Sequence, residues 1–454
     1  AAMVYVYTPE RSRSRGALSS ARRGSSSSYG GLARSGSSRK PQFTVNTKNA
    51  RGCRDLLNVI CDLRGDWRAT NLDATLRDDV LWVRGSDVEV SRESAGQRVS
   101  RIPELRRLCT KSGLARLVGK EQFHPRTFIL SADDDGDKSD VIPLKAWRTP
   151  LIYKPNSGAQ GNGITILFSA EELERHIEEQ CGGQKNAILQ KVIERPHLLE
   201  GGFKWDARVY CLILSTSPPR VFMSTEGLVR VCSEPWTPPT EGGAMNSQLT
   251  NYSISKLDPS FVHSDDPRDG ERGTKRTLSS TFEALRQRGC DTDRMMRDIS
   301  DIVSKTSSAM LRALREDDAY EETDCNFHVL GYDILFDEDL DAHLLEVNYS
   351  PSLDICSIFP LGETKPRLDH EFAADTAHAD LVLAASVVMG RRAEKRCNCT
   401  AHNRTHVHRP CAVDLVAKQA AIEGSLIIVE RDANSQGSIS MNDLCEGTDF
   451  VPCR

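Results

Sequence analysis

The sequence predicts a mixed α/β (α+β) protein, and three observations support this fold class. Short apolar runs rich in strand formers recur along the chain, including 331–335 and 344–348. A capping box at 169–172 opens a helix that runs toward a pair of glycines at 182–183. A longer helix is expected over about 292–315. Strands and helices interspersed in this way predict sheets covered by helices, and 454 residues are enough for more than one lobe.

A pair of acidic strand-like runs around a polar turn is the most informative element. Asp333 lies in the first run, Glu346 lies in the second, and the turn 337–341 separates them. If the turn closes a hairpin, the two carboxylates face each other with Cβ atoms about 4.5–5.5 Å apart. Asn348 joins Glu346 on the same face, because side chains alternate along a strand. These oxygen ligands suit Mg²⁺, although a solvated acidic hairpin is the alternative interpretation.

A glycine-rich connection lies between two further strand-like runs. The run 151–154 ends in Lys154, and the loop 155–163 that follows carries glycines that let the backbone approach phosphate oxygens closely. Such a loop is a weak signal alone, since glycine-rich hairpin tips are common. It does not fit the P-loop pattern, which requires Gly-Lys-Ser/Thr at the start of a helix.

A third strand-like run carries charges on one side. Alternation places Lys204, Asp206 and Arg208 on the same face, and Arg230 lies in another strand-like run. Three charges on one face of a strand suited to burial are costly unless they pair with one another or with a ligand. A row of ion pairs on an edge strand is the alternative interpretation. Cations gathered around a site with two carboxylates favour phosphoryl transfer from Mg-ATP.

Six motifs occur in order along the chain: Tyr153-Lys154-Pro155 with its loop, 190–194, 204–208, 226–230, 249–254 and 345–352. Together they resemble the tubulin tyrosine ligase-like family of ATP-grasp ligases, and within it most closely the tubulin polyglutamylases. The stretch 97–111 is also similar, and the resemblance covers about residues 45–390. It implies an ATP-grasp fold in which a small N-terminal lobe accompanies central and C-terminal lobes that enclose the nucleotide.

The resemblance implies roles for individual residues. Contacts with ATP are implied for Lys154, Gln160, Gly161, Gln190, Lys191, Val192, Ile193, Lys204, Trp205, Asp206, Thr250 and Asn251. The pocket for the incoming amino acid is implied to contain Arg230, Tyr252, Ser253, Lys275 and Lys365. Asp333, Glu346 and Asn348 are the implied magnesium ligands, and Arg208 and Glu346 the implied catalytic residues. The chain departs from the family pattern at Val192, Trp205 and Gln248, which puts rate and affinity in question more than the reaction.

The implied activity is that of an ATP-dependent protein–amino acid ligase that forms an amide bond and produces ADP. The expected acceptor is a carboxylate in the acidic C-terminal tail of tubulin, and the expected amino acid is L-glutamate. Lys275 favours glutamate, because its second carboxylate needs a cationic partner. A tubulin glycylase, a tyrosine ligase of the same family and a microtubule-binding pseudoenzyme are the alternatives. The filled metal positions argue against the pseudoenzyme.

Composition sets further expectations. The net charge is −5 with 27% charged residues, so local patches must attract an acidic partner. The 14 cysteines are scattered and are interpreted as reduced thiols of a cytosolic protein. No stretch of 18 apolar residues occurs, so no spanning helix is expected. We expect a monomer in the cytoplasm on the cytoskeleton, with the cilium or basal body as further candidate locations and no nucleic-acid or membrane partner. The opening Ala1-Ala2-Met3 suggests a fragment or a gene model without its true start.

The predicted segments are a disordered basic Ser/Gly/Arg-rich arm, an N-terminal lobe, a central ATP-grasp lobe, a C-terminal ATP-grasp lobe with the metal hairpin, and a basic then flexible tail: 1–42, 43–105, 106–200, 201–390 and 391–454.

Two basic or metal-binding features are predicted within these segments. A basic amphipathic helix is expected over 103–120, and with the strip 391–396 it is expected to attract the acidic acceptor. The Cys/His cluster 397–411 has ligand chemistry for zinc, but its spacing matches no standard finger. A flexible basic strip is the favoured interpretation of that cluster, and zinc binding stays open.

Overall fold

We describe a computed structural model of the chain, in which one compact unit spans Pro41–Arg454. The described residues are 43–72, 78–84, 97–130, 149–156, 161–181, 186–239, 247–250, 262, 266–318, 320–321, 325–360, 406–435 and 438–453. The predicted arm 1–42 and the basic strip 391–396 lie outside them. None of the described helices combines the length and the hydropathy that crossing a membrane requires.

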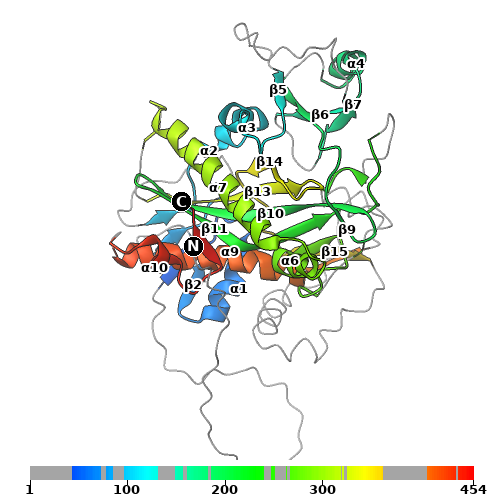
Figure 1. The fold of residues 1–454 in the computed structure, drawn as a ribbon. Helices are drawn as coiled ribbons and strands as arrows, with labels where there is room; N and C mark the ends of the chain where they lie inside the picture. Colours follow the sequence, from blue (N-terminus) through cyan, green and yellow to red (C-terminus); the bar gives the residue numbers. More distant parts are fainter. Residues whose placement is uncertain are drawn as a thin grey trace, which may run out of the picture. The chain divides into compact units, whose positions relative to one another are not determined.

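An antiparallel central sheet organises the fold (Figure 1). Its strand order is β12-β11-β10-β13-β14, with β17 paired to β11 and β9 paired to β10. The bounds are β9 Leu198–Leu199, β10 Phe203–Thr216, β11 Pro219–Val231, β12 Lys275–Thr277, β13 His328–Phe336, β14 Ala342–Asn348 and β17 Phe450–Pro452. β13 is buried along its whole length, as expected for an inner strand covered on both faces.

Helices cover one face of this sheet. Ala207, Val209 and Cys211 of β10 pack in one core cluster with side chains of α7 (Thr292–Arg315). The bounds of the other helices in this cluster are α2 Leu105–Leu108, α3 Lys111–Val118 and α6 Leu278–Gln287. The predicted helix 292–315 is confirmed. The predicted single helix 103–120 is wrong, because Thr110 caps a second helix there by accepting a hydrogen bond from the N–H of Gly113.

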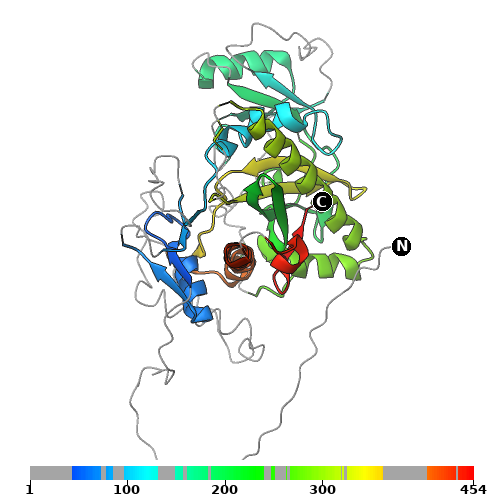
Figure 2. The same ribbon diagram turned by 90° about the vertical axis from the view of Figure 1, so that its left-hand side faces the viewer.

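The opposite face of β10 is shared between a polar cavity and a second apolar core. Tyr210, Leu212 and Leu214 pack in a cluster with α9 (Ala412–Ser435) and with a small N-terminal α/β unit (Figure 2). That unit has a parallel sheet in the order β2-β1-β3-β4. Its elements are β1 Phe43–Asn46, α1 Arg54–Arg64, β2 Trp67–Thr70, β3 Val80–Leu81 and β4 Arg98–Val99.

The prediction of a flexible tail within 391–454 is wrong for residues 406–435 and 438–453. Helix α9, helix α10 (Met441–Cys445) and strand β17 form there, and most of α9 is buried. Apolar residues occur on every side of α9, so the sequence lacks the single apolar stripe that marks a surface helix. Its buried Asp432 also forms ion pairs with Arg98 and Arg220, which fix α9 against β4 and β11.

The predicted Cys/His cluster is only partly described. His406 and His408 lie in β16 (His406–Pro410), which pairs with β15 (Cys356–Pro360), and Cys411 is buried beside it. Within the described part of the chain, no group of three or more Cys, His, Asp or Glu side chains is arranged to hold a metal ion. The ten cysteines whose side chains the structure describes are free thiols, as predicted.

A second, four-stranded antiparallel sheet lies across the cavity from the central sheet. Its order is β5-β8-β6-β7, and its strands are β5 Thr127–Leu130, β6 Leu151–Pro155, β7 Thr165–Leu167 and β8 Ala187–Lys191. Helix α4 (Ala170–Cys181) begins where predicted, since the Ser169 hydroxyl accepts from the N–H of Glu172 at 3.2 Å. Each strand run that the sequence predicted around the loop 155–163 therefore belongs to this sheet.

Candidate functional site

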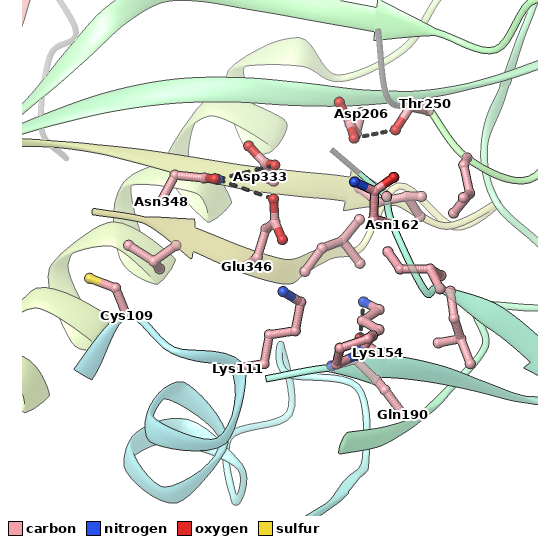
Figure 3. A pocket seen from close by; sticks show the side chains of 18 of the residues that line it. Cys109, Lys111, Lys154, Asn162, Gln190, Asp206, Thr250, Asp333, Glu346 and Asn348 are labelled. Atoms are coloured by element: carbon pink, nitrogen blue, oxygen red, sulfur yellow. Dashed lines mark hydrogen bonds between the residues drawn. The ribbon is translucent and has the colours of Figure 1, made fainter. Parts of the chain in front are cut away.

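A cavity of about 660 Å³ lies between the two sheets, with α3 at its edge (Figure 3). Strands β6 and β8 supply one wall, and β10, β11, β13 and β14 supply the other. Apolar side chains line one part of it: Ile152, Ile164, Ile166, Val192, Leu335 and Leu345. Charged groups line the rest. This division suits a ligand with a flat apolar ring and a charged extension.

The acidic hairpin forms as predicted. Asp333 and Glu346 are register partners in β13 and β14, and Gly331 pairs with Asn348. The side chain of Asp337 closes the turn, because its Oδ1 accepts from the N–H groups of residues 339 and 341 at 3.1 and 3.0 Å. Three polar side chains of the hairpin therefore project from one face of the sheet into the cavity.

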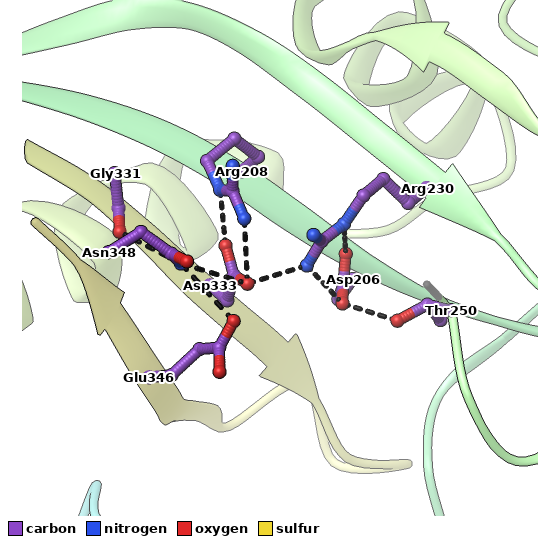
Figure 4. A network of polar contacts seen from close by, with 8 residues as sticks. All are labelled: Asp206, Arg208, Arg230, Thr250, Gly331, Asp333, Glu346 and Asn348. Atoms are coloured by element: carbon purple, nitrogen blue, oxygen red, sulfur yellow. Dashed lines mark hydrogen bonds and ion pairs between the residues drawn. The ribbon is translucent and has the colours of Figure 1, made fainter. Parts of the chain in front are cut away.

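The amide of Asn348 lies between the two hairpin carboxylates. Its Nδ2 donates to Asp333 Oδ2 at 3.3 Å and to Glu346 Oε1 at 3.2 Å (Figure 4). One oxygen of each carboxylate thus lies within hydrogen-bond distance of the same point, which the Nδ2 atom of Asn348 occupies. This donor set fits a hard divalent cation, with Asn348 turned to present its carbonyl oxygen.

Asp333 is a fully paired buried carboxylate. Arg208 contacts both of its oxygens, the Nη2–Oδ2 bond being 2.9 Å, and Arg230 Nη2 lies 2.8 Å from Oδ2. Burial raises the pKa of Asp333, but Arg208 and Arg230 outweigh it and hold the pKa well below its ordinary value. Asp333 is therefore ionised at neutral pH.

Arg230 joins a second carboxylate to this network. Its Nε and Nη2 donate to Asp206 at 2.6 and 2.7 Å, and the hydroxyl of Thr250 donates to the same carboxylate. Burial raises the pKa of Asp206 despite the opposing effect of Arg230. The charged face of β10 thus forms ion pairs with the flanking strands β11 and β13, while Lys204 and Asp206 also line the cavity. The interpretation of charges that serve one another and the cavity is confirmed, whereas the edge-strand alternative is wrong because β10 lies between β11 and β13.

Glu346 has a different electrostatic environment. Burial and the neighbouring Asp333 raise its pKa, and Lys111 and Arg208 oppose that rise. Figure 3 shows Lys111 and Lys154 pointing toward Glu346 from the facing wall. A cation near Glu346 and Asp333 would lower the pKa of Glu346 and favour its charged form.

The facing wall carries a buried lysine. Lys154 Nζ donates to Gln190 Oε1 at 2.7 Å, and Gln190 Nε2 donates to the hydroxyl of Thr127 at 3.0 Å. Burial lowers the pKa of Lys154 to about 8, against the opposing effect of Glu346. Burial also lowers the pKa of Lys204 across the cavity. Two ammonium groups of reduced hydration form a strong site for a polyanion.

The structure brings most of the predicted site residues to this cavity. They are Lys154, Gly161, Gln190, Lys191, Val192, Ile193, Lys204, Asp206, Arg230, Thr250, Asp333, Glu346 and Asn348. Five others fall outside the described residues, namely Gln160, Asn251, Tyr252, Ser253 and Lys365.

Three predicted residues do not line the cavity. Trp205 points into the core, where it stacks on Phe336 with ring centroids 5.4 Å apart, because alternation turns it away from Lys204. Arg208 is held by Asp333 behind the cavity wall. Lys275 Nζ lies 2.6 Å from Asp414 of α9. The side-chain contact predicted between Trp205 and a nucleotide therefore has no basis in this structure.

The sequence analysis missed several lining residues. Lys111 follows the N-cap of α3, and Asn156 Oδ1 accepts from the N–H of Ser112 at 2.9 Å, which ties α3 to the second sheet. Arg84, Arg106 and Asn162 also line the cavity. Lys111 and Arg106 were assigned only to an acceptor-binding helix, and no local pattern distinguishes them from ordinary surface cations.

Comparison with known proteins identifies the family. The Tubulin-tyrosine ligase family matches residues 95–361. Tubulin polyglutamylase ttll-11 of Caenorhabditis elegans is 30% identical over 344 residues, which is 70% of this chain and 47% of that protein. Tubulin polyglutamylase ttll6 of Danio rerio is 34% identical over 304 residues, 63% of this chain and 36% of that protein. Tubulin polyglutamylase TTLL13 of Mus musculus is 35% identical over 292 residues, 61% of this chain and 33% of that protein.

The chain spans between a third and a half of the length of these relatives. The family match begins just before β4 and ends just after β15, so it includes the whole cavity except Arg84. The predicted α/β fold of ATP-grasp type is confirmed by this match and by the mixed sheets and helices. The chain belongs to the tubulin tyrosine ligase family.

Proposed function

We propose that the protein is an ATP-dependent protein–glutamate ligase, a tubulin polyglutamylase that adds glutamate to carboxylates of the acidic tubulin tail. One observation supports this most strongly: a hairpin with Asp333, Glu346 and Asn348 faces Lys154 across a cavity, in a chain 30–35% identical to proteins named tubulin polyglutamylases. The names of the relatives also favour work on the microtubule cytoskeleton. The proposal includes a cytoplasmic location, with the cilium or basal body as further candidates. A monomer would suffice, since one chain supplies every group named here.

The reaction would have two steps. An oxygen of the acceptor carboxylate attacks the γ-phosphorus of ATP, the bond to the bridging oxygen breaks, and ADP leaves. The amine of free L-glutamate then attacks the acyl carbon, phosphate leaves with the bonding electrons, and the nitrogen loses a proton. Both steps concentrate negative charge near the phosphates, so catalysis would consist mainly of positioning and charge neutralisation.

The cavity residues suit these tasks. Lys154 and Lys204 would bind phosphate oxygens, and the segment from Gln190 to Ile193 would hold the adenine between apolar side chains. Asp333, Glu346 and Asn348 would hold Mg²⁺, which would offset part of the negative charge of the phosphates. Arg208 keeps Asp333 ionised and oriented for that purpose.

The choice of amino acid is tested by feeding the protein labelled amino acids one at a time. Labelled glutamate should enter tubulin in the presence of ATP, whereas glycine and tyrosine should not. Incorporation of glycine or tyrosine instead would identify one of the two family alternatives. ATP binding without any incorporation would favour a pseudoenzyme.

Nucleotide binding should depend on pH through Lys154. Phosphate oxygens favour its charged form, and because the pKa of Lys154 is about 8 in the ligand-free protein, that form is lost as pH rises above this value. We expect ATP affinity to be flat below the pKa and to fall about tenfold per pH unit above it, until the pKa of the complex is reached.

Calorimetric titration with ATP between about pH 7 and 9.5 measures this dependence. The Lys154→Arg variant is the matched control, since its guanidinium stays charged and its affinity should fall less steeply with pH, with Lys204 left to titrate. Equal slopes for the two proteins would show that another group titrates.

Capture of the acidic acceptor should depend on Arg106 at the cavity. Arg106 is exposed and lines the cavity, whereas Arg116 of α3 is exposed but does not line it. Arg106→Glu should raise the KM for tubulin several-fold and leave ATP binding unchanged, while Arg116→Glu changes the net charge equally with little effect.

The salt dependence of the wild-type protein gives a second readout. Exposed charge attraction is screened over about 8 Å at physiological salt, so tubulin modification should fall steeply between about 50 and 200 mM salt. Equal behaviour of the two charge reversals, or indifference to salt, would argue against an acidic acceptor guided by this surface.

A further inference from the structure

A buried histidine outside the cavity holds the segment that follows the acidic hairpin. His328, at the start of β13, is 4% exposed, and both of its ring nitrogens form hydrogen bonds. Its Nε2 lies 2.7 Å from the carbonyl oxygen of Tyr349, and its Nδ1 accepts from the N–H of Ile102 at 3.3 Å. Because Nδ1 accepts, it carries no proton, and Nε2 is the nitrogen that donates to Tyr349. Burial also lowers the pKa of His328 to about 4, which agrees with a neutral ring.

The segment 349–351 is held at each of its residues. The imidazole stacks on the ring of Tyr349, with centroids 4.3 Å apart and an angle of 25° between the ring planes. Arg84 Nη2 donates to the carbonyl oxygen of Ser350 at 3.3 Å. Pro351 packs against Gly331 of β13, where an added Cβ would lie only 2.8 Å from the Cβ of the proline. The segment therefore has one defined position against β13.

Tyr349 and Ser350 line the cavity directly after the hairpin residue Asn348. Figure 3 shows Asn348 on one side of the cavity and Gln190 on the other, where Gln190 is the register partner of Ile152 in the apolar part. In the proposed function, the adenine occupies the apolar part and the phosphates lie at the hairpin. The acceptor carboxylate would then reach the γ-phosphate from the end that Tyr349 and Ser350 form.

We propose that His328 is a positioning residue that holds Tyr349 and Ser350 where the acceptor carboxylate enters the cavity. This inference rests on the proposed function. His328 does not itself line the cavity, so it acts only through the segment that it holds. A rigid ring with two hydrogen bonds and a stacking face fixes that segment closely, and a misplacement of about 1 Å at a reacting group can cost about a hundredfold in rate.

Two substitutions in the full chain separate the two hydrogen bonds of His328. Glutamine places its amide nitrogen where Nε2 lies and can still donate to Tyr349, whereas asparagine places its oxygen where Nδ1 lies and can still accept from Ile102. His328→Asn should raise the KM for tubulin at least about fivefold and His328→Gln less than about twofold, while the KM for ATP changes less than about twofold in both. Equal KM values for tubulin in the two variants, or a matching rise in the KM for ATP, would overturn the proposal, because a purely structural histidine would not separate its two bonds in this way.

His197→Asn is the matched control. The Nδ1 of His197 accepts from Nε1 of Trp205 at 3.1 Å, and its N–H donates to the carbonyl oxygen of Phe336 at the opposite end of β13 from His328. The substitution removes the same ring from beside another aromatic side chain and leaves the segment 349–351 untouched. The KM for tubulin should therefore stay unchanged, and a rise as large as that of His328→Asn would show that general damage to the sheet explains both.

A second variant covers the case in which His328→Asn does not fold. Tyr349→Leu removes the ring on which His328 stacks and keeps the backbone carbonyl that accepts its hydrogen bond. The KM for tubulin should rise while the KM for ATP stays unchanged. An unchanged KM for tubulin would contradict the proposal.

Binding of a fluorescent tubulin-tail peptide separates this inference from the proposed function. Peptide binding that weakens in His328→Asn, in a protein that transfers no glutamate to tubulin, contradicts only the proposed function. Glutamate transfer to tubulin with the same KM in the wild type and in His328→Asn contradicts only this inference.

Discussion

Replacing Glu346 by glutamine should reduce ligase activity at least a hundredfold while the protein stays folded. The substitution keeps the size of the side chain but removes one of the two hairpin carboxylates that face the cavity. Without it, Asp333 would be the one hairpin carboxylate left at the cavity, and Arg208 and Arg230 already neutralise it. Catalysis that depends on a cation held at this point should therefore be lost.

The stability of the same variant gives an independent readout. Because burial and the neighbouring Asp333 raise the pKa of Glu346 in the folded protein, the charged form of Glu346 destabilises the fold. This penalty is absent below the ordinary pKa of a glutamate and grows as pH rises toward and through the raised pKa. Glu346→Gln should thus be at least as stable as the wild type at pH 7 to 8, when thermal midpoints are compared.

Magnesium-dependent strengthening of ATP binding should disappear with the activity. Substantial turnover by the folded variant would exclude Glu346 from the site.

Replacing Arg230 by methionine should destabilise the protein by about 3–5 kcal/mol. Arg230 neutralises two buried carboxylates at once, and its own side chain is only 16% exposed. Loss of the guanidinium leaves Asp206 with the hydroxyl of Thr250 and without its cation. The thermal midpoint should therefore fall by several degrees, and more at pH 8 than at pH 5, because protonation of Asp206 relieves the penalty.

Two matched variants define this prediction further. Arg107→Met breaks an ion pair with Asp317 whose side chains are 52% and 25% exposed, and should cost about 1 kcal/mol or less. The double variant Arg230→Met, Asp206→Asn should regain part of the stability, since it removes the unpaired charge as well. An Arg230 effect no larger than that of Arg107 would contradict the view that this network fixes the cavity wall.

The acidic hairpin could be predicted from sequence because its information is local. The position of the turn determines the register of Asp333 and Glu346, and strand alternation adds Asn348. The charged face of β10 could be predicted in the same way, from strand alternation. Its ion-pair partners could not be predicted, because Arg230 reaches both Asp206 and Asp333 only through the strand order β11-β10-β13. Pairing between distant strands is a tertiary property that spacing along the chain does not encode.

Helix α9 could not be predicted from the sequence. A helix that is apolar on all sides lacks the periodicity on which the prediction depends, and its charges mimic a polar surface. Asp414, Lys418 and Asp432 are buried, and their partners lie in β12, β4 and β11 and in the loop at Asp354. The split between α2 and α3 was missed for a smaller reason, since a mid-helix threonine and an N-cap threonine look alike without the backbone.

Tandem mass spectrometry of tubulin tails after incubation with the protein tests the central claim most directly. With ATP, Mg²⁺ and L-glutamate, the wild-type protein should produce tail peptides that carry one or more added glutamates on glutamate side chains. These products should be absent without ATP and absent with Glu346→Gln. Unmodified tails in the complete reaction, or equal modification by Glu346→Gln, would contradict the assignment of a glutamate ligase whose chemistry takes place at the acidic hairpin.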